Sequence, residues 1–227
     1  MVFIALLALL VGLLVYGNLV AYRAVRAPVV VAVNLVLGGA LVAAARTQGI
    51  SWRALGLDPS DAGGGLAWGL GAVVATVLVG AAITATPLRR ALADIRAVDM
   101  APRTLRFHYL VRIPFGTALF EEVVFRGILL ALLAEGGLEV AAILTSSAAF
   151  GLWHIGASLD LLGANRPDAG PRAKALAVAT GVALTFVGGI GFAVLRVASE
   201  SLLAPVLAHA AINVVGFTLT RPEPTVP

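Results

Sequence analysis

The amino-acid sequence predicts an all-α protein, a polytopic bundle of about seven transmembrane helices. Of its 227 residues, 60% are hydrophobic and 12% are charged, and the mean hydropathy is +0.99. Soluble domains are about half apolar and about a quarter charged, and a soluble core of this size could not bury so much apolar surface. The apolar residues also form separate runs long enough to cross a bilayer, which takes about 20 residues per helix.

Seven such runs can be placed, and the segments between them hold the charged and turn-forming residues. The predicted spans are 2–21, 28–45, 64–86, 111–134, 138–158, 174–195 and 201–220. A split or re-entrant segment would change the number by one, which gives a range of six to eight. The first run lacks the basic start of a secretory signal, so we interpret it as a retained helix. Within the long polar segment 87–112, residues 89–98 could form a short helix on the membrane surface.

The positive charges are distributed unequally between alternate loops. Twelve of the 16 Lys and Arg residues fall on one side of the predicted bundle, six of them in the segment 87–112, and three fall on the other side. Because cytoplasmic loops are enriched in Lys and Arg, we expect this segment and the C-terminus to be cytoplasmic and the N-terminus to lie outside. The isoelectric point near 10.3 follows from these loop arginines, and we expect no nucleic-acid partner.

Several polar side chains lie inside the predicted spans, where a charge at the bilayer centre costs at least about 2.5–3.5 kcal/mol. All aspartates are in predicted loops. The polar residues at depth are Glu121, Glu122 and Arg126 in the fourth span, His154 in the fifth, and His209 and Asn213 in the seventh. An ion pair would account for Glu122 and Arg126 alone, but it leaves Glu121 without a partner. We therefore favour a chemical or transport site over a purely structural one.

The spacing of these residues places them on common helix faces. Three pairs are four residues apart: Glu122 with Arg126, Phe150 with His154, and His209 with Asn213. Residues at that spacing share one face of a helix. Since lipid cannot solvate polar groups, the three faces must turn toward one another or toward a water-filled cavity. We expect one shared cavity in the cytoplasmic half of the bundle.

The residue types limit the chemistry of such a site. The chain has no cysteine, no His-Glu-x-x-His zinc helix, no intramembrane aspartate and no Gly-x-Ser-x-Gly. A Ser–His pair with Ser146 or Ser147 would leave both glutamates unexplained. Glu121, His154 and His209 could hold a Zn²⁺ ion. Alternatively, a glutamate could activate a water without metal, while a second histidine and an asparagine donate hydrogen bonds to the oxyanion.

At these residues the sequence resembles the CAAX protease and bacteriocin-processing (CPBP, or Abi) family, which is related to the prenyl-protein endopeptidases. The motif Glu-Glu-x-x-x-Arg is found at 121–126, Phe-x-x-x-His at 150–154, and His-x-x-x-Asn at 209–213. A Ser-Leu-Leu-Ala-Pro segment precedes the last motif, and Leu-Gly-Leu at 55–57 is similar to an upstream loop of bacterial members. Each motif is short, but all three occur in order and each lies on a predicted span.

The resemblance implies an all-helical intramembrane protease that cuts without a covalent enzyme intermediate. The roles it implies are general base for Glu121, water activation for His154, an oxyanion hole for His209 and Asn213, and support of the site for Glu122, Arg126 and Phe150. It leaves the use of a metal open. It covers roughly residues 50–220, so we expect one membrane-embedded domain with N-terminal spans and loop over 1–62 and a catalytic core over 63–220.

We therefore predict an intramembrane endopeptidase that acts on a membrane-associated or lipidated peptide or protein from the cytoplasmic side of a bacterial plasma membrane. Its partners would be this substrate and the lipid bilayer, and the sequence gives no indication of oligomeric state. Two alternatives stay open. One is a non-proteolytic immunity or scaffold protein that has kept the site. The other is an ion or proton transporter that uses the glutamates and histidines as a relay, although the sequence lacks recognisable inverted halves with broken helices.

Overall fold

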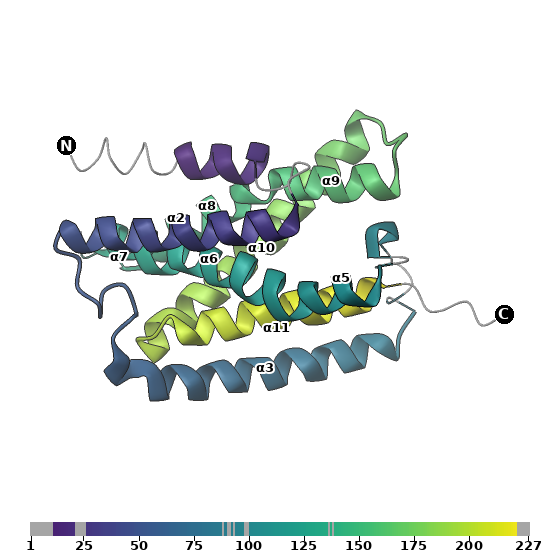
Figure 1. Ribbon diagram of the computed structural model, residues 1–227. Coiled ribbons are helices and arrows are strands. Elements are labelled where there is room, and N and C mark those ends of the chain that lie inside the picture. The colour runs from purple at the N-terminus through teal and green to yellow at the C-terminus, as the bar shows by residue number, and fades with distance from the viewer. Residues whose placement is uncertain are drawn as a thin grey trace.

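A bundle of helices forms around one central helix that carries both intramembrane glutamates. The computed structural model of the protein describes residues 11–20, 26–87, 89, 92, 94–97, 100–135, 137 and 139–221, and no strand occurs among them. The outer helices are α2 (Ala27–Thr47), α3 (Ala62–Thr84), α8 (Glu139–Trp153), α9 (Ile155–Asn165), α10 (Pro171–Ser199) and α11 (Leu203–Thr220). Figure 1 shows α3 and α11 running side by side along the bundle, while α2 runs along it on the other side and packs against the central helix.

The central helix is continuous from 102 to 134 but changes its winding along the way. Its consecutive parts are α5 (Pro102–Phe107), η4 (His108–Leu119), α6 (Phe120–Glu122), η5 (Val123–Leu129) and α7 (Leu130–Ala134), of which η4 and η5 are π-helical. Every residue from 120 to 130 is buried. A helix that is buried on all sides must lie inside the bundle, so this part of the chain faces other helices rather than lipid.

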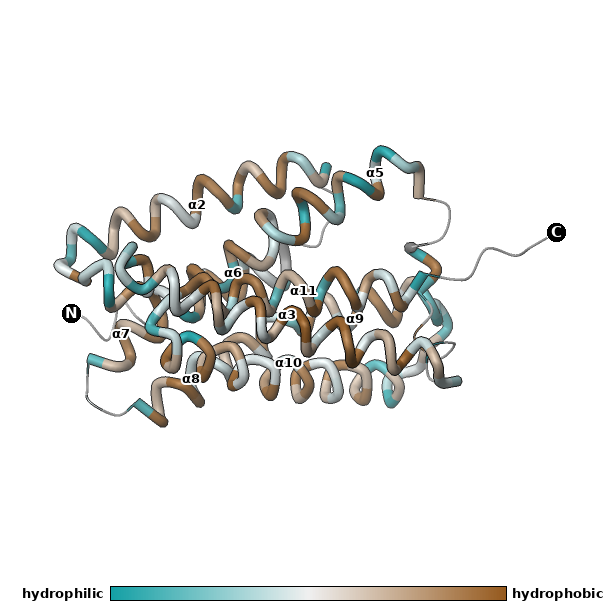
Figure 2. The backbone as a smooth tube through the Cα atoms, turned by 90° about the horizontal axis from the view of Figure 1, so that it is seen from below, coloured by the Kyte–Doolittle hydropathy of each residue, from teal (hydrophilic) through white to brown (hydrophobic). Residues whose placement is uncertain are grey.

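The predicted all-α membrane bundle is confirmed. Five helical stretches in the described part of the chain are long and apolar enough to cross a membrane, at 27–47, 59–84, 139–165, 171–199 and 203–220. They correspond to five of the predicted spans, and the central helix corresponds to a sixth. Of the first predicted span only 11–20 is described, and it is helical, ending in η1 (Tyr16–Val20). Figure 2 shows hydrophobic residues along the helices and hydrophilic ones gathered toward the ends of the bundle.

The fifth span differs from the prediction, and the predicted surface helix lies largely outside the described residues. The predicted fifth span ends at 158, whereas the helical stretch continues to 165 and is interrupted at His154. The predicted surface helix 89–98 lies mainly outside the described residues, of which Arg89 is helical and Ile95–Ala97 form a short turn, η3. Polar contacts hold this turn, because Asp94 binds Arg96 and accepts a hydrogen bond from Asn165.

The loop between α2 and α3 covers the end of the bundle where α10 ends and α11 begins. It contains the short turn η2 (Pro59–Asp61). Arg196, near the end of α10, donates hydrogen bonds to the carbonyl oxygens of Arg53 and Ala54 at 2.9 Å each. Gly56 has a φ of +71°, and a side chain there would collide with the Arg196 guanidinium. This loop therefore ties the start of α3 to the α10–α11 turn, where the backbone of Leu202 also donates to Gly56.

Candidate active site

The two adjacent glutamates lie in the most deeply buried part of the central helix. Glu121 is 3% exposed, and Glu122 and Arg126 are 0% exposed. The three-residue α6 that ends with them is bracketed by the π-helical segments η4 and η5. π-Helical turns widen a helix and are frequent at functional sites. The sequence therefore places two carboxylates and one guanidinium in the interior of the bundle, away from lipid headgroups, so most of their partners must come from the protein.

Glu122 is the centre of an internal charge network. Its Oε1 accepts a hydrogen bond from Arg126 at 3.0 Å, and the Nδ1 atom of His209 lies 2.7 Å from the same oxygen. Arg126 also donates to the carbonyl oxygen of Gly189 on α10 at 3.0 Å. These contacts join the central helix to α10 and α11. Losing one member of such a buried pair leaves the other charge unpaired, which typically costs about 3–5 kcal/mol.

Glu121 has a different environment, with one oxygen bonded and the other open. Its Oε1 accepts a hydrogen bond from the indole nitrogen of Trp153 at 3.1 Å. Its Oε2 is buried and receives no hydrogen bond from the described residues. The Nε2 atoms of His154 and His209 lie 3.9 Å and 3.8 Å from that oxygen. At these separations the atoms are too far apart for direct hydrogen bonds, and a single water can bridge them.

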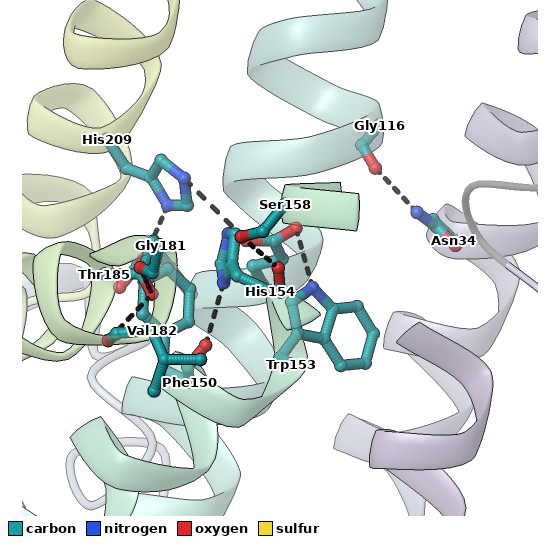
Figure 3. Close-up of polar contacts among 12 residues, drawn as sticks. Asn34, Gly116, Phe150, Trp153, His154, Ser158, Gly181, Val182, Thr185 and His209 are labelled. Carbon is teal, nitrogen blue, oxygen red and sulfur yellow. Dashed lines mark hydrogen bonds and ion pairs between the residues drawn. The ribbon is translucent and has the colours of Figure 1, made fainter. Parts of the chain in front are cut away.

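His154 is presented by an interruption in the helix that carries it. α8 ends at Trp153 and α9 begins at Ile155, with His154 between them. The Nδ1 atom of His154 is 2.8 Å from the carbonyl oxygen of Phe150. Because a carbonyl oxygen can only accept, Nδ1 carries the hydrogen and a neutral ring presents an unprotonated Nε2 toward Glu121. Figure 3 shows His154 and Trp153 beside each other, with His209 facing them from α11.

Aromatic rings hold the two imidazoles and the arginine in place. The ring of Phe150 lies 4.6 Å from that of His154 and 5.7 Å from that of His209, edge to face in both cases. The Arg126 guanidinium carbon is 4.2 Å from the centre of the Phe150 ring, a cation–π distance. On the other side, Phe192 stacks on His209 at 4.8 Å. Phe150 thus contacts three of the polar side chains predicted for the site.

Asn213 is the one predicted residue that no contact joins to this cluster. It follows His209 by one turn on α11 and is partly exposed. Its side chain forms no hydrogen bond with the described residues. The structure therefore brings Glu121, His154 and His209 together around one point. Asn213 lies one turn from His209 on the same helix but forms no hydrogen bond with the cluster.

A cavity of about 40 Å³ reaches the site from the side of α2. It is lined by Val30, Val31, Asn34, Arg112, Gly116, Thr117, Glu121 and Trp153. A water needs roughly 10–15 Å³ of such space, so the cavity has room for two or three. Asn34 closes one wall, since its amide donates to the Gly116 carbonyl at 2.7 Å and accepts from Tyr16. The contact between Asn34 and Gly116 appears at the right of Figure 3.

The open question of a metal depends on the arrangement of possible ligands. Among the described residues, no group of three or more His, Cys, Asp or Glu side chains is arranged to hold a metal ion. One imidazole nitrogen of each histidine is already engaged, by Phe150 for His154 and by Glu122 for His209. The other nitrogen of each ring, Nε2, is directed at Oε2 of Glu121.

Several residues of the site are absent from the sequence-based prediction. Trp153 directly precedes His154 and is buried, with 1% exposure. Because tryptophan is rare, its position next to a motif histidine could have indicated a role in the site. Gly189 contributes only a backbone carbonyl to Arg126, so its residue type carries no signal. Asn34 and Tyr16 lie in predicted apolar spans, where a polar amide also requires a partner.

Comparison with known proteins places this arrangement in a family. Residues 103–215 match the family described as type II CAAX prenyl endopeptidase Rce1-like. The matched segment runs from α5 into α11 and so contains all three motifs and the cluster around Glu121. No curated protein and no solved structure matches the chain.

Proposed function

Because the chain belongs to the Rce1-like family of type II CAAX prenyl endopeptidases, we propose that it hydrolyses a peptide bond in a membrane-associated or lipidated peptide or protein. Glu121 is the general base, and the attacking group is a water. The observation that carries the proposal is the buried Oε2 of Glu121. It receives no hydrogen bond from the described residues and faces the Nε2 atoms of His154 and His209 at 3.9 Å and 3.8 Å.

The first step is activation of the water between Glu121 and His154. The water donates one hydrogen to Oε2 of Glu121 and the other to Nε2 of His154, whose tautomer is set by its contact with Phe150. Glu121 removes a proton as the water oxygen bonds to the scissile carbonyl carbon. A positioned general base typically contributes about 10²–10⁴-fold to a rate. Trp153 holds the other carboxylate oxygen, so only one oxygen is directed at the water.

The developing oxyanion is stabilised by His209 and Asn213. The Glu122 carboxylate accepts from Nδ1 of His209, so Nε2 can donate to the oxyanion when the ring carries a second proton. Charge balance supports that state: two ionised glutamates and Arg126 sum to one negative charge, which a protonated His209 cancels. A buried cluster of zero net charge costs less than an unbalanced one. The amide of Asn213, one turn away on the same face, is the second donor.

Collapse of the tetrahedral intermediate completes the reaction. The proton held by Glu121 moves to the departing amine nitrogen as the carbon–nitrogen bond breaks. Collapse gives a carboxylic acid and an amine, and the acid passes the remaining water hydrogen to the amine. The products are a carboxylate and an ammonium group, and Glu121 is again ionised. No covalent bond to the enzyme forms at any point, and Glu122 and Arg126 keep their charges throughout.

The entrance to the site lies on the side of the arginine-rich segment. The cavity extends from Glu121 to Arg112, which is nearer the start of the central helix and therefore nearer the segment 87–101. Because the segment 87–112 holds six of the twelve basic residues of the predicted cytoplasmic side, we assign that face and the C-terminus to the cytoplasm of a bacterial cell. Basic side chains there attract anionic lipid headgroups by about 1 kcal/mol each. A lipidated substrate would reach Glu121 from this leaflet.

The test uses the purified protein in lipid nanodiscs and synthetic peptides. Three peptides share one sequence ending in Cys followed by two aliphatic residues and a variable residue: one S-prenylated, one S-acylated and one unmodified. Mass spectrometry identifies the products of the wild type and of a His154→Gln variant. Cleavage of a lipidated peptide by the wild type alone supports the proposal. Cleavage of none, or equal cleavage by both proteins, would favour a non-proteolytic role.

A further inference from the structure

The hydrogen-bond ladder of the helix that presents His154 is interrupted at that residue. In a continuous α-helix the N–H of Gly156 would donate to the carbonyl oxygen of Leu152, four residues earlier. Instead, the backbone N–H of His154 donates to Gly151 at 3.0 Å, a tighter turn, and the helix restarts at Ile155. The N–H of Gly156 and the carbonyl oxygen of Leu152, which form one rung of that ladder, belong to a candidate membrane span, in which unpaired backbone groups are costly.

The side chain of Asn18 occupies the place of that rung. Its Nδ2 donates to the carbonyl oxygen of Leu152 at 3.1 Å, and its Oδ1 accepts from the N–H of Gly156 at 2.6 Å. The second hydrogen of Nδ2 is directed to the carbonyl oxygen of Leu14, in its own helix, at 3.0 Å. One carboxamide therefore satisfies both ends of the broken rung, with its own donors fully used.

Two glycines allow this close approach. A side chain at Gly17 would collide with the ring of Trp153. A Cβ at Gly156 would lie 3.0 Å from the backbone oxygen of Asn18, closer than ordinary packing permits. Tyr16 also contacts this part of the chain, with its ring centre 6.1 Å from that of Trp153. The first helix is thus fitted against the interruption at three successive residues.

We propose that Asn18 is a positioning residue for His154: it replaces a helix hydrogen bond and so keeps α8 and α9 interrupted at the histidine. The inference rests on the proposed function, in which His154 holds the attacking water. It assigns a role in the site to the first helix, which lies outside the matched segment 103–215. Without the carboxamide, Leu152 and Gly156 pair with each other, the helix continues through His154, and its imidazole moves away from Glu121.

Kinetics of an Asn18→Leu variant test this role. Leucine has a similar size and neither donor nor acceptor, and a displacement of about 1 Å at a reacting group can cost about 10²-fold in rate. We expect kcat to fall by that order with KM little changed. The matched control is Arg196→Met, which also removes two hydrogen bonds to backbone carbonyls of a distant segment. The control should lower Tm and leave kcat within a factor of about 2.

An Asn18→Asp variant provides a rescue that depends on pH. A protonated carboxyl group has one O–H donor and one carbonyl acceptor and can bridge Leu152 and Gly156 as the carboxamide does, whereas a carboxylate repels the Leu152 carbonyl. The ratio of its kcat to that of the wild type, measured at the same pH, should therefore rise as pH falls. A ratio that does not change with pH, together with wild-type kcat for Asn18→Leu, would overturn the positioning role while leaving the proposed function intact.

A structural readout makes the inference independent of activity. Nitroxide labels at Leu144 on α8 and Leu161 on α9, both exposed, report the distance across the interruption. In the otherwise wild-type protein this distance should be narrowly distributed, and Asn18→Leu should shift or broaden it, whereas Arg196→Met should not. An unchanged distribution would contradict the inference. If the distribution changes but the wild type cleaves no peptide, the proposed function fails and the structural role of Asn18 stands.

Discussion

Trp153 donates a hydrogen bond from its indole nitrogen to Oε1 of Glu121 across 3.1 Å, from the last residue of α8 to the middle of the central helix. The bond fixes the rotation of the carboxylate, so that Oε2 points at the two histidines. The Trp153 side chain also lines the cavity that leads to Glu121. The orientation of the proposed base is therefore set by a neighbour of a motif histidine and not by the motif residue itself.

Replacing Trp153 by Phe should lower kcat without preventing folding. The smaller ring keeps most of the apolar contact but removes the donor, and a hydrogen bond to a charged group is worth about 1.5–3 kcal/mol. We expect kcat to fall roughly 10- to 100-fold, because 1.4 kcal/mol corresponds to a factor of ten. Steady-state kinetics in nanodiscs would measure this. A Trp68→Phe variant, at an exposed position of α3, is the control and should keep wild-type kcat.

The pair formed by Glu122 and Arg126 should be a major contribution to stability. Because both side chains are 0% exposed, Glu122→Ala and Arg126→Ala each leave one charge unpaired and should each lower the free energy of unfolding by about 3–5 kcal/mol. The double variant should be less destabilised than the sum of the two. Thermal or denaturant unfolding in detergent provides the measurement. Additive effects of the two substitutions would mean that the residues do not interact.

These results also indicate what the sequence was able to predict. The convergence of the central helix, α8 and α11 followed from polar residues four positions apart in apolar spans, because lipid leaves such faces no other partner. The contact of Glu122 with both Arg126 and His209, and the position of Glu121 near His154, agree with that expectation. The spacing of polar residues and the cost of burying charge were sufficient to predict that these helix faces meet.

The supporting contacts could not be predicted in the same way. The interruption at His154 depends on Asn18, which is 136 positions away in the chain, and Arg126 binds a backbone carbonyl whose residue type is irrelevant. Both arise from how helices dock, and docking is not encoded in local spacing. The contacts that fix Asp94, from Asn165 and from Arg96, likewise depend on docking between segments far apart in the chain.

Asp94 should make the stability of the protein depend on pH. Burial alone would raise the pKa of its carboxyl group, but hydrogen bonds from Arg96 and Asn165 outweigh this effect and hold the pKa below its ordinary value. A group with a lowered pKa in the folded state stabilises the protein above its unfolded pKa, about 3.9. The wild type should therefore have a higher Tm than Asp94→Asn at neutral pH. This difference should shrink as pH falls below about 4, and a constant difference would contradict the assignment.

The proposed topology can be tested with single cysteines, since the natural chain has none. Arg96→Cys lies in the arginine-rich segment, and Glu135→Cys lies just after α7, at the other end of the central helix. A membrane-impermeant maleimide added to intact cells should label residue 135 and not residue 96. Residue 96 should become reactive once the membrane is permeabilised. Labelling of residue 96 in intact cells would place the arginine-rich face outside the cell and exclude entry from the cytoplasm.

The central claim is that Glu121 removes a proton from the attacking water. The most direct measurement is kcat for Glu121→Gln in nanodiscs, on whichever lipidated peptide the wild type cleaves, with Tm measured on the same sample. The carboxamide has the shape of the carboxylate and can still accept from Trp153, but it cannot accept the proton of the water. We predict a loss of at least about 100-fold in kcat with a Tm close to that of the wild type. A folded Glu121→Gln variant that retains wild-type kcat would contradict the account.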